Sequence, residues 1–346
     1  HTLSQVQDAG AGHLNLTTTY TWDGVGEELS VTEGAGTASA RTTSYVYDQL
    51  GRRTRTVVDP GSGHLNLTTG YAYDGNGNLV TLTDPKGNVT RYVYDEANEQ
   101  VYHIDASGAV VQSFYDADRR VTATRTYATA ISLNGLSTAP TLADVAARVL
   151  QASTDQRRYT VYDAAGRVHY TVDPLGYITE QRYDVAGRPS ETLTYAYPVS
   201  NQAFTNANMW TAMVTGTADP GMAALITAAG NTDANAHATL NLYDADGDVR
   251  FVVQQNTINS QLVAQVSEHR YDAAGRVLSD IVYGTTIPLG SITALTAQLS
   301  TTSVAQTLAS STSLHPTRYV YDAAGCLRYT IDAGNYIGAG DTNGVA

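Results

Sequence analysis

Two acidic stretches contain residue types that could bind calcium. They are Asp244–Asp248, with the sequence DADGD, and Asp74–Asn78, with the sequence DGNGN. Carboxylate and amide oxygens are the ligands that Ca²⁺ prefers. The spacing does not fit the D-x-D-x-D-G calcium loop, and Gln255 stands where its bidentate glutamate would fall. We therefore favour ordinary turns and predict no metal-binding residue.

The histidines and the cysteine offer no catalytic arrangement. The eight histidines lack HxxxH or HExxH spacing, and His169 reads as a strand residue beside Tyr170. Cys326 occupies the position that Arg167 and Arg276 hold in similar stretches, which favours a structural position over a nucleophile. A G-x-S-x-G motif, a phosphate loop and a dinucleotide fingerprint are also absent from the sequence. We predict no catalytic residue and no cofactor.

The heptapeptide GHLNLTT occurs twice, at residues 12–18 and 63–69. Its alternating pattern is typical of a strand with one apolar face, so we expect a strand that enters a turn rather than a duplicated binding site. Asn15, Asn66 and Asn88 begin Asn-x-Thr sequons, a pattern that arises easily in strands rich in threonine and asparagine.

A tyrosine followed by an aspartate recurs along the whole chain. The pairs are Tyr47-Asp48, Tyr73-Asp74, Tyr94-Asp95, Tyr115-Asp116, Tyr162-Asp163, Tyr183-Asp184, Tyr243-Asp244, Tyr271-Asp272 and Tyr321-Asp322, with Trp22-Asp23 as an altered copy. Three of the gaps between successive tyrosines are 21 residues long and the others are longer. This spacing defines a short repeat with insertions.

The clearest repeat is YDAAGRVHYTVDPLGYITEQRYD, residues 162–184. AAG and DPLG have the composition of turns, and the residues between them alternate with a period of two. Each repeat is thus predicted to be a β-hairpin. The predicted fold class is mainly β, a continuous antiparallel hairpin meander with short helical excursions. We use the word excursion for a segment of extra chain that replaces a turn. We expect the repeated tyrosines to form cross-strand aromatic ladders.

The insertions divide the chain into two expected parts. Residues 1–93 hold repeats without long insertions, as a two-hairpin module duplicated at a 51-residue offset. Residues 94–346 hold repeats with excursions at about 128–158, 196–240 and 284–316, each starting after a tyrosine twelve residues beyond the tyrosine–aspartate pair: Tyr127, Tyr195 and Tyr283. We expect both parts to form one continuous repeat domain.

Each excursion contains a helical pattern. In the first, Thr141 and Asp144 have capping-box spacing, and Leu142, Val145, Ala146, Val149 and Leu150 form an apolar stripe. In the second, Asp219 and Pro220 are placed as N-cap and first helical residue, with Gly230 as the stop. In the third, residues 291–311 have a helical pattern with weaker caps.

The composition limits the classes of partner. The net charge of -13 and the scattered arginines argue against binding to nucleic acid or to an anionic membrane. No apolar run approaches the length of a membrane span, and the single cysteine excludes an intrachain disulfide. The chain has 24 tyrosines and 3 phenylalanines, which suits half-hydrated surfaces. Because residue 1 is a histidine, we expect a piece of a longer protein.

The pattern YDxxGRxxxTxDPxGxxTxxxYD, as it stands at residues 162–184, resembles the YD or RHS repeat of bacterial Rhs proteins, the B and C components of Tc insecticidal toxins, and the teneurins. The resemblance covers nearly the whole chain and is closest to long YD-repeat proteins of bacterial surfaces. It implies a spiralling β-sheet that closes into a hollow shell. Those shells are built from longer chains than this one.

Rhs and Tc shells also carry an aspartyl self-cleavage site after a DPxGL-type motif. The nearest match here is DPLGY at residues 173–177, which lies in mid-chain and lacks the following leucine. Similar turns begin at Asp84 and Asp59. We interpret all three as hairpin turns, because aspartyl chemistry needs two acids with separated pKa values and no partner is specified.

The predicted function is structural: part of a hollow β-shell, tube or fibre of a large secreted or cell-surface bacterial protein. The expected partners are further repeats of the same chain or identical copies, joined edge to edge. One alternative is a toxin shell that encloses a cargo domain. A second is an adhesin that binds surface glycans by stacking on tyrosine rings. An enzymatic function is not predicted.

Overall fold

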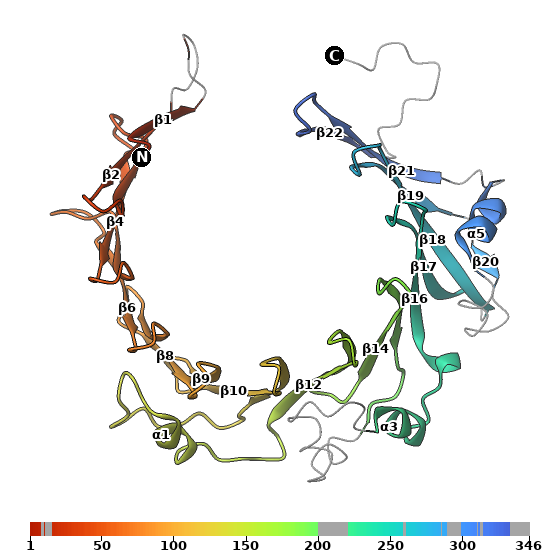
Figure 1. The fold of residues 1–346 in the computed structure, drawn as a ribbon, viewed down its shortest axis with the longest axis horizontal. Helices are drawn as coiled ribbons and strands as arrows, with labels where there is room; N and C mark the ends of the chain where they lie inside the picture. Colours follow the sequence, from red (N-terminus) through yellow and green to blue (C-terminus); the bar gives the residue numbers. More distant parts are fainter. Residues whose placement is uncertain are drawn as a thin grey trace. The chain divides into compact units, whose positions relative to one another are not determined.

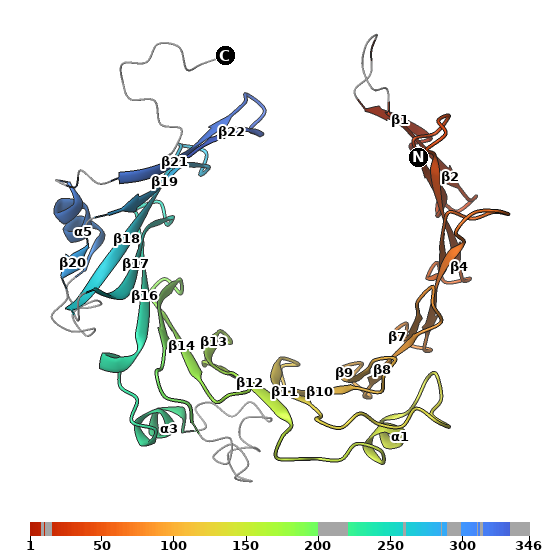
Figure 2. The same cartoon turned by 180° about the vertical axis from the view of Figure 1, so that it is seen from behind.

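The computed structural model describes residues 1–7, 10, 16–199, 221–258, 261–284, 286–288, 299–309, 311 and 314–332. It divides into two compact units, His1–Arg157 and Arg158–Ala346. Each unit is described by itself below, and Figures 1 and 2 show their elements.

The first unit is an antiparallel meander in which each strand pairs with the next along the chain. Its elements are β1 Ser4–Gln7, β2 Leu16–Trp22, β3 Glu28–Glu33, β4 Arg41–Tyr47, β5 Arg53–Val58, β6 Leu67–Tyr73, β7 Leu79–Thr83, β8 Val89–Tyr94, β9 Gln100–Ile104, β10 Val110–Tyr115, β11 Val121–Thr126 and α1 Leu142–Ala146.

The second unit continues the same plan from β12, whose first residues belong to the first unit. Its elements are β12 Gln156–Tyr162, β13 Val168–Val172, β14 Ile178–Tyr183, β15 Pro189–Thr194, α3 Met222–Ala228, the 3-10 turn η2 Asp233–Asn235, β16 His237–Tyr243, β17 Val249–Ile258, β18 Gln261–Tyr271, β19 Val277–Tyr283, β20 Ile287–Pro288, α5 Thr301–Leu308, β21 Leu314–Tyr321 and β22 Leu327–Ile331. Successive strands again pair antiparallel, with β19 pairing to β21 and β20 pairing to β18.

The predicted mainly β hairpin meander is confirmed, and the structure adds a feature that the repeat pattern did not indicate. The pairing register shifts by one residue at the tyrosine of the repeat, for example between Val161 and Tyr162 and between Arg182 and Tyr183. Such a bulge increases the local twist and re-aims the side chain beside it. Each repeat therefore turns its tyrosine toward the tyrosine–aspartate turn of the preceding repeat.

The second GHLNLTT copy is not strand throughout, which corrects our expectation. β6 begins at Leu67, and His64, Leu65 and Asn66 belong to the loop before it. Asn66 has a φ of 49°, and its side chain accepts the Gly61 N–H and donates to the Gly61 carbonyl. This left-handed residue closes the loop, so the alternation of the heptapeptide reflects strand structure only in its last three residues. In the first copy, residues 12–15 lie outside the described residues.

The first excursion forms the predicted capping box. Thr141 Oγ1 accepts the Asp144 N–H at 3.2 Å, and Asp144 Oδ2 accepts the Thr141 N–H at 2.9 Å. Val145 is fully buried, and Leu142 and Val149 pack against the core. The prediction is wrong for Ala146, the last residue of α1, and for Leu150, which lies beyond the helix, because both are exposed.

Of the other two described helices, α3 starts differently from the prediction. α3 begins after Gly221, which is the N-cap with a φ of 82°, so the predicted start at Asp219 and Pro220 is wrong. These two residues lie outside the described residues. Gly230 follows the helix with a φ of 79°, as predicted for a stop. α5 begins after Ser300, which forms a capping box with Ser303, and the predicted helical residues 291–298 lie outside the described residues.

The excursions cover one side of the sheet in each unit, while the opposite side carries no described helix (Figures 1 and 2). The core that includes α1 contains Val93, Tyr102, Ile104, Val110, Tyr127, Ile131, Leu136 and Val145 of α1 itself. The core that includes α5 contains Leu240, Phe251, Val253, Ala264, Val266, Ile281, Tyr283 and Ile287, together with Val304 and Leu308 of α5. By contrast, no residue of β1–β6 is buried. Across the described residues, no helix has the length and apolar character needed to cross a membrane.

Candidate functional site: the tyrosine–aspartate turns

The aspartate of each repeat closes the hairpin turn. Asp163 Oδ1 accepts the N–H groups of Ala165 and Arg167, both at 2.9 Å, and the Asp163 N–H donates to the Arg167 carbonyl at 2.8 Å. Gly166 has a φ of 79°, which glycine adopts without steric cost. The same side-chain bonds recur at Asp48, Asp74, Asp95, Asp116, Asp184, Asp244, Asp272 and Asp322.

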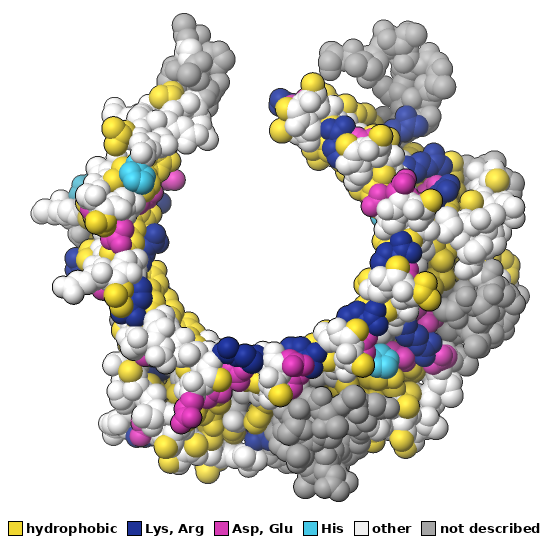
Figure 3. Space-filling view, in the orientation of Figure 1, with side chains coloured by type: hydrophobic (Ala, Val, Ile, Leu, Met, Phe, Trp, Pro, Cys, Tyr) yellow, Lys and Arg dark blue, Asp and Glu magenta, His cyan; other side chains and the backbone are white. Residues whose placement is uncertain are grey.

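The arginine four residues after the aspartate joins one repeat to the next. Arg167 Nε donates to Asp163 Oδ2 at 2.8 Å, and its guanidinium carbon lies 4.1 Å from the centre of the Tyr183 ring. Such a cation over a ring is stabilising. The same arrangement places Arg52 over Tyr73, Arg188 over Tyr243 and Arg276 over Tyr321. Figure 3 shows several basic side chains (dark blue) with acidic side chains (magenta) beside them.

The hydroxyl group of the tyrosine completes this connection. Tyr183 Oη donates to the carbonyl of Val168, which begins the second strand of the preceding hairpin, at 2.7 Å. The equivalent bonds run from Tyr47 to Glu28, Tyr73 to Arg53, Tyr94 to Leu79, Tyr115 to Gln100, Tyr243 to Pro189, Tyr271 to Val249 and Tyr321 to Val277. Each of these tyrosines therefore fixes its own repeat to the one before it. Tyrosine-on-tyrosine stacking stays a prediction.

Trp22 is held in a similar way in the altered copy. Its Nε1 donates to the Thr2 carbonyl at 2.9 Å, and its ring stacks on His1 at 4.6 Å between centroids. Asp23 Oδ1 accepts three backbone N–H groups, from Val25, Gly26 and Glu27.

The last repeat shows how the missing arginine is replaced. Cys326 stands where the arginine would be, and it is exposed. Arg328, two residues later on β22, donates from Nε to Asp322 Oδ2 at 2.7 Å. Side chains two residues apart on a strand lie on the same face of the sheet. Arg328 therefore lies on the same face as position 326, from which it can bond to Asp322.

The hydrogen bonds of the turns lower the pKa values of the aspartates. For Asp48, Asp184, Asp272 and Asp322, the main cause of the lowered pKa is the N–H donated by the residue four positions later. A carboxylate that accepts backbone N–H bonds favours its charged form. These groups are therefore turn-closing acceptors and poor general acids near neutral pH.

We predict loss of stability in acid. Because the folded-state pKa values of these aspartates lie below their ordinary value of 3.8, the stability that they add is complete above that pH and is lost as the pH falls through the lowered values. Chemical denaturation followed by circular dichroism from about pH 5 to about pH 2 measures this loss. Asp184→Asn should flatten the pH dependence of stability, and an unchanged slope would contradict the assignment for Asp184.

We predict that Tyr183→Phe lowers the free energy of unfolding by about 0.5–1.5 kcal/mol, because the bond to the Val168 carbonyl is lost. Tyr183→Leu should cost about 0.5–1 kcal/mol more, because the ring under Arg167 is lost too. Denaturant titration of both variants separates the two contacts. Tyr197→Phe, at a 52% exposed position, is the control and should be neutral. Equal losses in both Tyr183 variants would show that the stacked ring contributes nothing.

The other acidic motifs are ordinary turns, as predicted. Asp173 Oδ1 accepts the N–H groups of Leu175 and Tyr177, and Asp84 Oδ1 accepts those of Lys86 and Asn88. Asp59 lies in the loop between β5 and β6, where Oδ1 is 2.6 Å from His64 Nδ1. Each carboxylate is occupied by the hydrogen bonds of its own turn or loop.

A second set of tyrosines holds the starts of the excursions, and here the hydroxyl bonds to a side chain fifteen residues earlier. The bonds run from Tyr127 to Gln112 at 2.7 Å, from Tyr195 to Glu180 at 2.5 Å and from Tyr283 to Glu268 at 2.6 Å. Burial, together with the bond to Glu268, raises the pKa of Tyr283 to about 12. The sequence marks these tyrosines only by their spacing, and their partners were not predicted.

The Tyr195 site contains a charge cluster that sequence reasoning missed. Arg182 Nε donates to Glu180 Oε1 at 2.9 Å, and its Nη1 lies 3.0 Å from Glu191 Oε2 and 2.9 Å from Asp233 Oδ2. Glu180 and Glu191 are buried, and Asp233 belongs to η2 in the excursion. Burial raises the pKa of Glu191. Arg182 thus links the sheet to the excursion. His169 lies beside the cluster, half-exposed, with Nε2 3.4 Å from Glu180.

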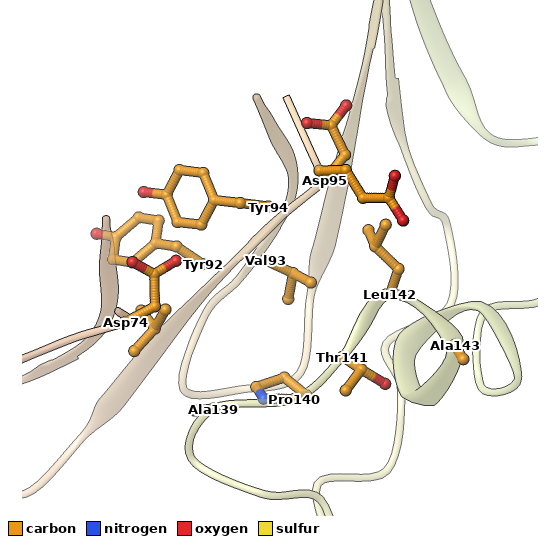
Figure 4. A pocket seen from close by; sticks show the side chains of 12 residues that line it. Asp74, Tyr92, Val93, Tyr94, Asp95, Ala139, Pro140, Thr141, Leu142 and Ala143 are labelled. Carbon is orange, nitrogen blue, oxygen red and sulfur yellow. The ribbon is translucent and has the colours of Figure 1, made fainter. Parts of the chain in front are cut away.

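A cavity of about 480 Å³ lies between β8 and the excursion of the first unit. Figure 4 shows Tyr92 and Tyr94 on one side and Thr141, Leu142 and Ala143 on the other. Asp74 and Asp95 also line it. The Tyr94 hydroxyl donates to the Leu79 carbonyl, and both aspartates close their turns. In the described ranges, no group of three or more His, Cys, Asp or Glu residues is arranged to hold a metal ion.

The comparisons with known proteins give a family match for two segments. A model described as the RHS repeat matches residues 73–103 and 162–197. These segments include tyrosine–aspartate turns and the turns that begin at Asp84 and Asp173. No curated protein matches the chain.

Among solved structures, the Tc holotoxin pore of Photorhabdus luminescens is similar at 11% identity and a TM-score of 0.44, over 92% of this chain and 15% of that chain. A crystal structure of TcdB2–TccC3 is similar at 12% identity and a TM-score of 0.35, over 92% of this chain and 18% of that one. A porin-like protein from Bacteroides uniformis matches at 13% identity and a TM-score of 0.15, over 86% of this chain and 91% of that chain. This chain thus spans under a fifth of the length of the two toxin chains.

Proposed function

Because this chain is an RHS-repeat protein, we propose that it forms part of the wall of a larger β-structure, a hollow shell, tube or fibre, in a secreted or cell-surface bacterial protein. The observation that carries the proposal is that the repeated aspartate carboxylates and tyrosine hydroxyls form hydrogen bonds within the sheet itself. In each repeat the aspartate closes a turn, and most of the repeated tyrosines bond to the carbonyl of the preceding strand.

The ends of the sheet support the same role. Among the described residues, β1 pairs only with β2, and β22 pairs only with β21. A strand with one unpaired edge presents a row of N–H and C=O groups to another strand. We expect further repeats, or identical copies, to occupy these edges.

The test is electron cryo-microscopy of the native, uncut assembly. The expected result is that strands outside this segment pair with the free edges of β1 and β22, in a closed capsule or along an axis. Edges that face solvent in the native assembly would overturn the proposal. A closed capsule with internal density would favour an enclosed cargo, and an open repeating wall would favour a tube or fibre. Protease digestion of intact cells tests the surface location. If the protein lies on the cell surface, the protease should cleave it without cell lysis.

A further inference from the structure

The last hairpin of the second unit exposes a group of apolar side chains. On β21 and β22, Leu314 is 44% exposed, Val320 42%, Tyr329 59% and Ile331 38%. Val320 and Tyr329 are direct cross-strand partners, and Leu314 pairs with Tyr283 of β19. We call these four residues the terminal apolar patch. Large exposed apolar groups that lie together mark interaction surfaces more often than isolated ones do.

The equivalent hairpin of an earlier repeat is covered. Val161 pairs with Tyr170 in β12 and β13 in the same register as Val320 with Tyr329, and Val172 corresponds to Ile331. In that hairpin Val161 is 6% exposed, Tyr170 7% and Val172 0%. The two hairpins thus carry valine opposite tyrosine in the same register, buried in one hairpin and exposed in the other. They differ at the next pair, where Val172 lies opposite the buried Tyr159 and Ile331 lies opposite the exposed Arg318.

The described excursions show what kind of segment covers this face. α3 and α5 each have two buried apolar side chains four residues apart on one helical face, Met222 and Ile226 in α3 and Val304 and Leu308 in α5. In the first excursion Val145 of α1 is buried, and Val149, beyond the end of the helix, packs against the same core. Val304 and Leu308 of α5 belong to the same buried cluster as Ile281 and Tyr283 of β19. The terminal apolar patch continues this covered surface directly, because Tyr283 pairs with Leu314.

Strands that stay uncovered in the first unit have a different composition on this face. Thr81 of β7 is buried on the covered face, and its cross-strand partners identify the residues on the same face of β6, β5, β4, β3 and β2 in turn. Most side chains on this face of β2–β4 carry hydroxyl groups, including Thr19, Thr21, Ser30, Thr32, Thr42 and Ser44. Several bond to one another, as Thr21 does to Ser30 at 2.6 Å and Thr32 to Thr42 at 2.8 Å. In this chain an uncovered face is rich in hydroxyl groups, so the apolar face of β21 and β22 is suited to a cover.

We propose that the terminal apolar patch binds a short amphipathic helical segment, with apolar side chains four residues apart, of the kind that α5 presents to β19. The interface is helix on sheet, and its core is Val320, Tyr329 and Ile331. The inference does not depend on whether the assembled wall is a shell, a tube or a fibre.

The test uses a fluorescent synthetic peptide with the sequence of residues 299–311, titrated onto the whole chain and followed by fluorescence anisotropy. The expected result is saturable binding that Tyr329→Ser and Val320→Ser each weaken by at least about tenfold, because each removes buried apolar area from the complex. A peptide with Val304→Ser and Leu308→Ser should not bind. Val46→Ser, at an exposed valine on β4, is the matched control and should leave binding unchanged.

The altered side chains are exposed, so the variants should melt as the parent chain does, and circular dichroism checks this. Absence of peptide binding would overturn the proposal, as would binding that the patch variants do not weaken. Sedimentation analysis gives a further check. A dimer that Tyr329→Ser abolishes would mean that two copies pair through the patch, and it would replace the helical partner proposed here.

Discussion

Gly176→Ala should destabilise the second unit by about 2–5 kcal/mol. Gly176 has a φ of 93°, and a Cβ there would lie 2.1 Å from the Val199 carbonyl oxygen. The left-handed conformation costs alanine about 1–2 kcal/mol, and displacing the backbone of the excursion costs about 1–3 kcal/mol more. The Val199 N–H donates to the Gly176 carbonyl at 2.9 Å, so this bond should be lost as the excursion moves away.

Gly87→Ala is the matched control for this experiment. Gly87 holds the same position in the turn that begins at Asp84, with a φ of 83°, but nothing lies within 4 Å of its added Cβ. It should therefore show the conformational cost alone, about 1–2 kcal/mol. Denaturant titration compares the two variants, and hydrogen exchange at the Val199 amide reports undocking of the excursion. Equal losses in both variants would show that the contact with Val199 does not hold the excursion.

Arg182→Met should lower the free energy of unfolding by about 2–4 kcal/mol. The change leaves Glu180, Glu191 and Asp233 without the cation between them, and breaking a fully buried ion pair costs about 3–5 kcal/mol. The expected loss is smaller because 34% of the Arg182 side chain is exposed, which screens the charges.

The pH dependence of this variant gives a second, sharper readout. Burial raises the pKa of Glu191. Without the opposing charge of Arg182, its folded-state pKa should lie still further above its unfolded value, so stability returns as the pH falls and Glu191 becomes protonated. The deficit relative to the parent chain should therefore be smaller at about pH 5 than at about pH 8. A deficit that does not change with pH would contradict charge compensation by Arg182.

Arg250→Met is the control for Arg182→Met. Arg250 lies 3.4 Å from the buried Glu268, which also bonds to Arg270 and Tyr283. Glu268 keeps these partners when Arg250 is lost, so we expect a loss below about 1 kcal/mol. Chemical denaturation of both variants under the same conditions makes the comparison.

Most of the local structure could be read from the sequence because it rests on short-range chemistry. Asp163 and Gly166 close a turn by bonds within five residues, and the alternation around Tyr170 indicates a strand. The capping box of Thr141 and Asp144 is equally local. Such features depend on the φ and ψ preferences and the hydrogen-bonding groups of neighbouring residues, which the sequence states directly.

The contacts between repeats were decided by the tertiary structure. Arg167 lies over a ring sixteen residues away, and Arg182 bonds to Asp233, 51 residues away and within an excursion. At such separations along the chain, sequence spacing does not identify the partner. The register shift at each tyrosine aims these groups, and one residue of register reverses the face on which a side chain lies. The sequence by itself therefore determined the repeated hairpin and its turns, while packing decided which residues bind the repeats and excursions together and which face is covered.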